Sequence, residues 1–156
     1  LIDEEICKKV EDIIQRKLYN TFYWDKFSLP EQDQRKSLNT NVGEISVLIP
    51  ISTNLKKEWP IHIKGKDTYT NENKTAVLVP GKVESIVLEC GDALIYLGCE
   101  RPVWRDKMPD NPKSFQIGKF WIDLRRNKEQ AYYHQICFNY VLADGNRAQC
   151  AYGMTQ

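Results

Sequence analysis

Apolar residues recur at helical spacing over the first twenty residues of the chain. Acidic residues, Glu4 and Glu5, stand where the first turn of such a helix would be, and this is where the helix dipole favours negative charge. The spacing of the apolar positions predicts an amphipathic helix over residues 2–19 that lies on a sheet. The positions that carry the stripe are Ile6, Val10, Ile13, Ile14 and Leu18.

From Glu44 onward the apolar period changes to two, which is typical of half-buried β-strands. Ile45, Val47, Ile49 and Ile51 form one face of the first such segment. Pro50 within it indicates an edge position or a bulge, because proline cannot donate to a strand ladder. Further strands are predicted over residues 59–63, 75–79, 83–88, 93–97, 115–124 and 132–142, with a polar loop over residues 64–74 and a turn at Pro80-Gly81.

Seven or eight strands with short connections and no interleaved helices indicate a sandwich or jelly roll rather than a parallel sheet. The chain has 156 residues, which is the usual length of one domain. We therefore expect a single domain over residues 1–156, mainly β, with a β core over about residues 44–143 and one amphipathic helix in front of it. The specific expectation is a double-stranded β-helix, that is, a jelly roll.

An aromatic group separates the predicted helix from the predicted strands. We interpret it as part of the core or as a lid over the core, and the polar stretch over residues 29–40 as a loop. The group consists of Tyr19, Phe22, Tyr23, Trp24 and Phe27.

The charge balance limits the classes of partner. The formal net charge is +1, from 22 basic and 21 acidic residues, so no strong overall field attracts nucleic acid or an anionic membrane. No apolar run reaches the ~20 residues that a membrane-spanning helix needs. The acidic start of the chain does not resemble a signal peptide. We expect neither a nucleic-acid nor a membrane partner, while a protein partner or a homo-oligomer stays open.

The cysteines are odd in number and form no Cys-x-x-Cys pair, so neither a zinc site nor a disulfide framework is predicted. We interpret them as reduced, mostly buried thiols, which favours a reducing, cytoplasmic compartment. They are Cys7, Cys90, Cys99, Cys137 and Cys150.

Several frequent active-site motifs are absent from the sequence: the dinucleotide-binding glycine pattern, the P-loop, His-Glu-x-x-His and Gly-x-Ser-x-Gly. The most informative segment runs from Cys90 to Arg105 and reads CGDALIYLGCERPVWR. It resembles the G-D-A-L-[IV]-Y-x-G-x-E-x-x-H-W-R-E segment of the iron- and 2-oxoglutarate-dependent oxygenases of the prolyl-hydroxylase-like group. The resemblance implies a double-stranded β-helix fold.

Two further segments resemble the same group, in the expected order. The segment from Glu44 to Pro50, followed by Glu58-Trp59-Pro60, is similar to its E-[IY]-S-V-L-x-x-L … W-P-L stretch. The segment from Gln135 to Gly145 is similar to its Q-V-F-L-H-Y-V-D-x-D-G stretch. The resemblance spans about residues 39–145.

The resemblance also implies where an iron site would lie. Such oxygenases hold iron with two histidines and one carboxylate. The aligned positions of the first two ligands are Asn39 and Asn41, and the distal histidine is replaced by Val103. Asn139 stands where the group often has histidine. Amides are poor ligands for such a metal and valine is none, so all three iron ligands are predicted to be lost, and we expect no metal and no catalytic residue.

The remaining candidate is Arg105, which matches the arginine after the distal histidine of the group. It is a candidate for binding an anion, or 2-oxoglutarate, without metal. It could equally be a surface or ion-paired residue. The chain has only two histidines: His62 is expected to pack in a strand or face solvent, and His134 is expected at the surface. Asp33 and Glu44 could each supply one carboxylate.

Three functions follow from the sequence. The first is an oxygenase-like protein that has lost its iron triad and serves as a non-catalytic binding or structural module. The second is an active Fe(II)/2-oxoglutarate-dependent dioxygenase, a hydroxylase of a protein or small molecule, which would need Fe(II) and 2-oxoglutarate as cofactors. The third is an assembly component, such as a virion-type structural jelly roll, in which the aromatic group packs on a partner.

Overall fold

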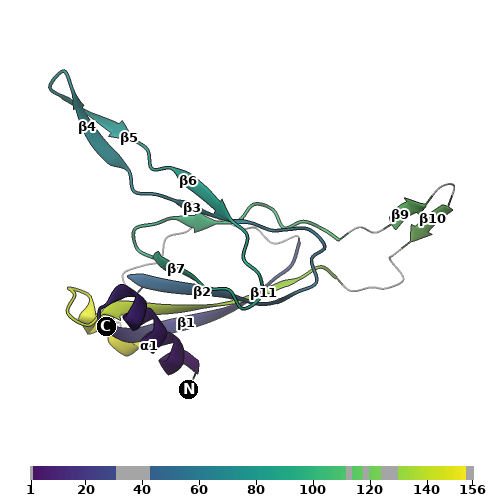
Figure 1. Ribbon diagram of the computed structural model, residues 1–156, viewed down its shortest axis with the longest axis horizontal. Helices are drawn as coiled ribbons and strands as arrows, with labels where there is room; N and C mark the ends of the chain where they lie inside the picture. Colours follow the sequence, from purple (N-terminus) through teal and green to yellow (C-terminus); the bar gives the residue numbers. More distant parts are fainter. Residues whose placement is uncertain (1, 31–42, 112–113, 118–119, 124–129, 154–156) are drawn as a thin grey trace.

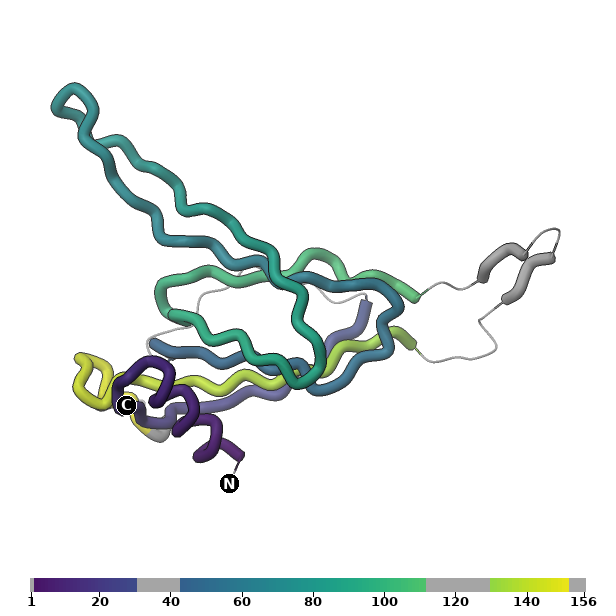
Figure 2. The backbone as a smooth tube through the Cα atoms, in the orientation of Figure 1, coloured from purple at the N-terminus to yellow at the C-terminus, as the bar shows by residue number. Residues whose placement is uncertain are grey.

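The computed structural model describes residues 2–30, 43–111, 114–117, 120–123 and 130–153. One α-helix at the N-terminus precedes a series of antiparallel strands, so the expected mainly β architecture with an N-terminal helix is confirmed. Figures 1 and 2 show the helix against one face of a sheet, and a long hairpin that projects away from the sheets. No helix in the described part of the chain is long and apolar enough to cross a membrane.

Helix α1 spans Ile2–Ile14, and the prediction that it reaches residue 19 is wrong. Gln15 adopts a left-handed backbone conformation, with φ of 57°, and its N–H still bonds to the Glu11 carbonyl, which is a common way for a helix to end. The Glu11 carboxylate then accepts the Leu18 N–H at 2.8 Å. Leu18 is apolar and buried, as the periodicity requires, but it is buried as the first residue of a strand.

A four-stranded antiparallel sheet forms the centre of the fold, in the order β1-β11-β2-β7. Its outer face packs against α1 through a cluster that includes Val10, Val47 and Tyr140. Asp3 of the helix accepts hydrogen bonds from Tyr140 Oη at 3.0 Å and Asn20 Nδ2 at 2.6 Å, which joins helix and sheet. The strands are β1 (Leu18–Ser28), β2 (Ile45–Thr53), β7 (Leu94–Leu97) and β11 (Tyr133–Leu142).

Pro50 lies in an inner strand of this sheet, at an irregularity of the ladder. Ser52 pairs with His134 and Pro50 with Gln135, so the register shifts there, as expected for a bulge. On the other side, β7 pairs with β2 only from Ile45 to Leu48. The proline therefore interrupts no described hydrogen bond toward β7, and its carbonyl accepts the N–H of Gly91 instead.

A three-stranded sheet faces the inner side of the four-stranded one, in the order β6-β3-β8. Leu48 and Cys137 from the first sheet pack with Ile61 from the second, in a cluster that fills the space between them. The two sheets thus share one apolar core. The strands are β3 (Ile61–Lys64), β6 (Val83–Ile86) and β8 (Val103–Trp104).

The polar segment over residues 64–74 is not a loop: it contains strand β4 (Thr68–Glu72), which pairs with β5 (Thr75–Val79). The turn residues Asn73 and Lys74 both have positive φ, 48° and 64°, which is the geometry of a tight two-residue hairpin. A lysine in the second position hides this turn from sequence reasoning, which relies on glycine there. All residues of β4 are exposed, so no apolar alternation marks this strand, whereas the strand predicted over residues 75–79 is confirmed as β5.

Pro80-Gly81 does not reverse the chain, contrary to the prediction. It lies between β5 and β6, and the pairing of β4 with β5 continues in the same register into that of β3 with β6. Residues 61–86 therefore form one long hairpin (Figure 1). Its neck is tight: a Cβ on Gly81 would lie 2.0 Å from the Gly65 carbonyl oxygen, so only glycine fits.

The predicted strand over residues 115–124 is a hairpin of two shorter strands, β9 (Ser114–Ile117) and β10 (Phe120–Asp123), as far as the described residues show. A 3₁₀ helix, η2 (Ala148–Gly153), follows β11. It packs beside β1 and β11.

The aromatic group of β1 is mostly exposed, so its interpretation as core or lid is wrong. Tyr23 is 64% exposed and Phe27 54%, and Trp24 alone contacts the inner core. The physical reason is that β1 is an edge strand of its sheet in the described residues, and α1 covers only part of the face that these rings occupy.

Candidate functional site

The structure describes only one of the three positions aligned with iron ligands. Asn39 and Asn41 lie outside the described residues. Val103 lies in β8, opposite Ile63, and packs at the rim of the core between the two sheets. Its partly buried side chain thus serves the packing between the two sheets.

Arg105, two residues further on, points into the molecule and is only 4% exposed, so it is not a surface residue. Its guanidinium lies between two aromatic rings, with Cζ 4.8 Å from the ring centroid of Trp59 and 4.5 Å from that of Tyr133. It donates hydrogen bonds to the Trp59 carbonyl, to Tyr133 Oη at 3.0 Å and to Gln135 Oε1 at 3.4 Å. All of these partners are neutral acceptors.

The described residues provide no carboxylate partner for this buried cation, and its Nε–H is buried without a hydrogen-bond partner among them. A second buried donor, the Ser28 hydroxyl, has no partner in the same part of the chain. Ser28 is fully buried and lies opposite Tyr133 in the ladder of β1 with β11. An unsatisfied buried donor costs about 1–3 kcal/mol, so two of them at one end of a core require an explanation.

Lys26 adds a second cation to this cluster. It is half-buried on β1, directly opposite Gln135, which is one of the acceptors of Arg105. Burial lowers the pKa of the Lys26 ammonium, and the charge of Arg105 lowers it further. Burial likewise lowers the pKa of Arg105, while it raises the pKa of the Tyr133 phenol. An anion placed here would relieve the repulsion between the two cations.

Asn139, where the oxygenase group often has histidine, is buried and serves the core. Its Oδ1 accepts the Ser46 hydroxyl at 2.8 Å, and its backbone carbonyl accepts the Thr21 hydroxyl at 2.9 Å. These contacts connect β11 to both of its neighbouring strands. The asparagine is therefore a structural link of the central sheet.

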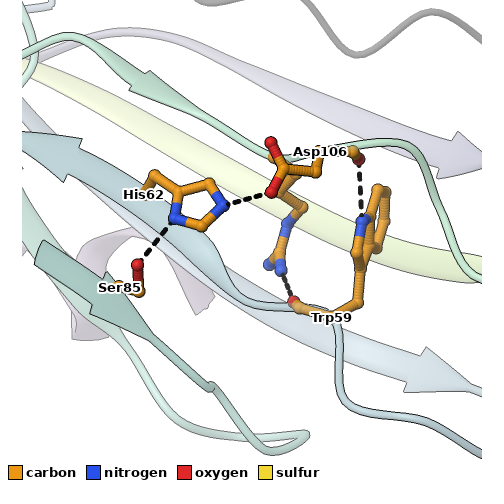
Figure 3. A network of polar contacts seen from close by, with 5 residues as sticks. Trp59, His62, Ser85 and Asp106 are labelled. Carbon is orange, nitrogen blue, oxygen red and sulfur yellow. Dashed lines mark hydrogen bonds and ion pairs between the residues drawn. The ribbon is translucent and has the colours of Figure 1, made fainter.

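The opposite side of the three-stranded sheet carries a second polar network (Figure 3). His62 Nδ1 lies 2.7 Å from Ser85 Oγ, and its Nε2 lies 2.9 Å from Asp106 Oδ2. Trp59 Nε1 donates to the Asp106 backbone carbonyl at 3.0 Å. Because Arg105 donates to the Trp59 carbonyl, the inner cluster and the outer network are joined through this tryptophan.

Sequence reasoning named Arg105 and missed Lys26, Ser28, Ser85 and Asp106. Nothing in the local sequence marks a lone lysine or serine as inward-facing, since their positions depend on which strands pair. His62 was expected in a strand, and this is confirmed, but its two partners come from residues far along the chain.

His134 also pairs with a carboxylate: its Nε2 lies 2.5 Å from Asp25 Oδ1. The ring lies tilted against that of Phe27, with centroids 6.0 Å apart, on the outer face of the central sheet. The expected surface position is thus confirmed. The pair has solvent around it, because 57% of the Asp25 side chain is exposed.

The described residues contain no group of three or more histidine, cysteine, aspartate and glutamate side chains able to hold a metal ion. Glu44 accepts the Leu142 N–H at 2.8 Å, so its carboxylate serves the central sheet, while Asp33 lies outside the described residues. All five cysteines are free thiols, but only Cys137 is buried and Cys90 is exposed, so the expectation that most are buried is wrong.

Comparisons with protein-family models, with curated proteins and with solved structures returned no match for this chain.

Proposed function

We propose that this protein is an oxygenase-like jelly roll that has lost its iron chemistry and binds a small anionic ligand between its two sheets. Arg105 and Lys26 hold the anion, and its chemical class is a carboxylate, such as 2-oxoglutarate or succinate, or a phosphate. The observation that carries the proposal is the Arg105 guanidinium, 4% exposed and provided only with neutral acceptors by the described residues.

The energetics favour a ligand at this place. A buried cation loses its hydration and regains it only from charges and hydrogen bonds around it. Arg105 has an unused Nε–H, and Ser28 at the same end of the core has an unused hydroxyl. An oxyanion supplies acceptors for such donors and a counter-charge for Arg105, whereas a water molecule supplies no charge.

The jelly-roll part of the proposal rests on the two packed sheets and on the connections between them. The four-stranded and three-stranded antiparallel sheets pack face to face, and connections pass between them from β2 to β3, from β6 to β7 and from β7 to β8. This agrees with the fold that the sequence resemblance implies.

Isothermal titration of the chain with 2-oxoglutarate, succinate and inorganic phosphate, in the presence of EDTA, tests the proposal. We expect binding of at least one anion without metal. Arg105→Gln should weaken it about 30-fold or more, as expected when a buried charge loses its partner. Arg105→Lys keeps the charge but not the planar fork, so it should give an intermediate loss.

Lys26→Met removes the second cation of the proposed site from a half-buried position, so it should weaken anion binding with less effect on the core. Arg16→Gln is the matched control. Arg16 is an exposed arginine paired with Asp144 at 2.6 Å, so its loss should leave anion binding unchanged. Absence of binding for all three anions contradicts the proposal. Anion binding that requires Fe(II) or Mn(II), together with release of succinate, would instead establish the active dioxygenase.

A second candidate function, assembly, is favoured by a separate observation. Strand β1 exposes four aromatic side chains, which a partner could cover: Tyr19, Phe22, Tyr23 and Phe27. Light scattering coupled to size-exclusion chromatography tests this function. A homo-oligomer that dissociates in the double variant Tyr23→Ser/Phe27→Ser supports assembly, and a monomer at all concentrations contradicts self-assembly.

A further inference from the structure

The outer face of the three-stranded sheet carries a row of side chains that does not contribute to the anion site. His62 on β3 pairs in register with Ser85 on β6 and with Trp104 on β8, so the three side chains stand side by side across the sheet. Ile61 and Val103 alternate with this row and point to the core. The row therefore faces away from the core, and Figure 3 shows Ser85 and Asp106 on opposite sides of the His62 ring.

The distances are those of a nucleophile, a base and an orienting acid. The Ser85 hydroxyl lies 2.7 Å from one imidazole nitrogen, and the Asp106 carboxylate lies 2.9 Å from the other. Because a carboxylate can only accept, its contact favours the tautomer with the proton on Nε2. That tautomer leaves the Nδ1 lone pair facing the serine hydroxyl, ready to accept its proton.

The base is held firmly while the nucleophile is open to solvent. The His62 side chain is 16% exposed and its ring lies 5.4 Å from the Trp104 ring, centroid to centroid. The Asp106 backbone is fixed by the bond from Trp59 Nε1, and the preceding Arg105 is anchored in the core. Ser85 is exposed on β6, which is an edge strand in the described part of its sheet.

The geometry points to Ser85 as a nucleophile that His62 activates toward activated carboxylic esters, with Asp106 orienting the histidine. The nitrogens are used in the opposite sense from the serine proteases, where the acid binds Nδ1, but either imidazole nitrogen can act as the base. The inference is independent of the proposed anion site, which lies on the inner side of the same sheet.

The reaction proceeds in two balanced steps. Ser85 Oγ forms a bond to the ester carbonyl carbon as its proton passes to His62 Nδ1. The bond to the leaving oxygen or sulfur then breaks, and that atom takes the proton from His62, which leaves an acyl-serine. In the second step, water gives a proton to His62 Nδ1 as its oxygen attacks the acyl carbon. The bond from that carbon to Ser85 Oγ then breaks, and Oγ takes the proton from His62, which releases the acid and the free serine.

The open position of Ser85 indicates the substrate class. A nucleophile on an exposed sheet face offers little enclosure for a developing oxyanion, and such stabilisation supplies a large part of the rate in enclosed sites. We therefore expect acyl donors whose leaving group needs little help, namely thioesters and aryl esters with small acyl groups, and slow turnover.

A fluorophosphonate probe applied to the full chain tests the assignment, because it phosphonylates activated serines and its fluoride leaves as the bond to oxygen forms. Peptide mapping by mass spectrometry should locate one probe on Ser85. Ser85→Ala should abolish the label, and His62→Gln should slow labelling about 100-fold, the lower end of a general-base effect. Asp106→Asn should give a smaller decrease.

His134→Gln is the matched control, because the His134 ring also pairs with an aspartate but makes no hydrogen bond to a serine hydroxyl in the described structure. It should leave labelling of Ser85 unchanged. A p-nitrophenyl acetate assay should then show a nitrophenolate burst that requires Ser85 and His62. Absence of label on Ser85, or labelling of Ser85 that is the same in His62→Gln, overturns the inference.

Discussion

Arg105 and Asp106 are neighbours in the chain, but their side chains lie in different environments. The arginine is 4% exposed among aromatic rings, while 77% of the aspartate side chain is exposed beside His62. A charge inside the sandwich is strongly affected by its partners, whereas a charge on the outer face is screened by water. Removing a side chain should therefore cost much more stability on the inner face than on the outer one.

The largest effect is expected from Leu48→Ala on the inner face. Leu48 is 2% exposed in the cluster that joins the two sheets, so its truncation should lower the free energy of unfolding by about 2–5 kcal/mol. Leu78→Ala on the projecting hairpin is the matched control. Leu78 is 50% exposed, and its loss should change stability by less than about 0.5 kcal/mol. Urea unfolding followed by circular dichroism measures both; equal losses would contradict the placement of the core.

The next effect should come from Ser46→Ala, which removes the donor to Asn139 Oδ1 at 2.8 Å. Both residues are buried, and the loss of this buried hydrogen bond should cost about 1–3 kcal/mol. The same substitution at Ser85, on the exposed side, should stay within about 0.5 kcal/mol. Chemical denaturation of the two variants measures both losses of stability. A larger loss for Ser85→Ala than for Ser46→Ala would contradict the expected difference between the inner and outer faces.

A gradual effect is expected at alkaline pH, because it is spread over several pH units. Burial raises the pKa of the Cys137 thiol from 9.0 to about 12, so the unfolded chain releases this proton before the folded one does. Stability should therefore be constant below about pH 8 and fall between about pH 9 and 12, by up to about 1.4 kcal/mol per pH unit from this group. Unfolding in urea at several pH values measures the slope, which should decrease in Cys137→Ala. At pH 8, iodoacetamide should modify the exposed Cys90 long before Cys137.

The smallest effect is expected from His62→Gln. The His62 side chain is 16% exposed, but its two polar partners are open to water, because Ser85 is exposed and 77% of the Asp106 side chain is exposed. The change in the free energy of unfolding should be less than about 0.5 kcal/mol. Thermal unfolding measures it. A loss of several kcal/mol would mean that the outer network holds the sheet together, and the catalytic variants would then need a stability correction.

The sequence predicted strands where apolar, β-branched residues are frequent. The segments around Val47 and Ile136 are of this kind, and both are found as strands of the central sheet that are buried on both faces. It failed for β4, whose residues are all polar or exposed, because burial and not propensity produces the alternating pattern, whereas β5 was predicted with the bounds that it has. It also failed at Leu18, where helical spacing continued past the residue at which a side-chain contact from Glu11 ends the helix.

The candidate sites were predictable only in part. Arg105 was identified from its place in a segment that resembles a known family, and the structure adds that it is buried. Lys26 and Ser28 reach the same cluster because β1 pairs with β11, a pairing between segments more than a hundred residues apart. No local pattern contains such long-range information, so the inner cluster could not be predicted.

The two-residue turn at Asn73 and Lys74 also determines how the long hairpin reaches its final pairing during folding. Hairpins close from their turn within about 1–10 μs, and the ladder then extends residue by residue toward the base. Because the register runs unbroken through the neck, this turn determines that His62 meets Ser85. One residue inserted in the turn would shift the partner of His62 by a position and place Ser85 on the other face of the sheet.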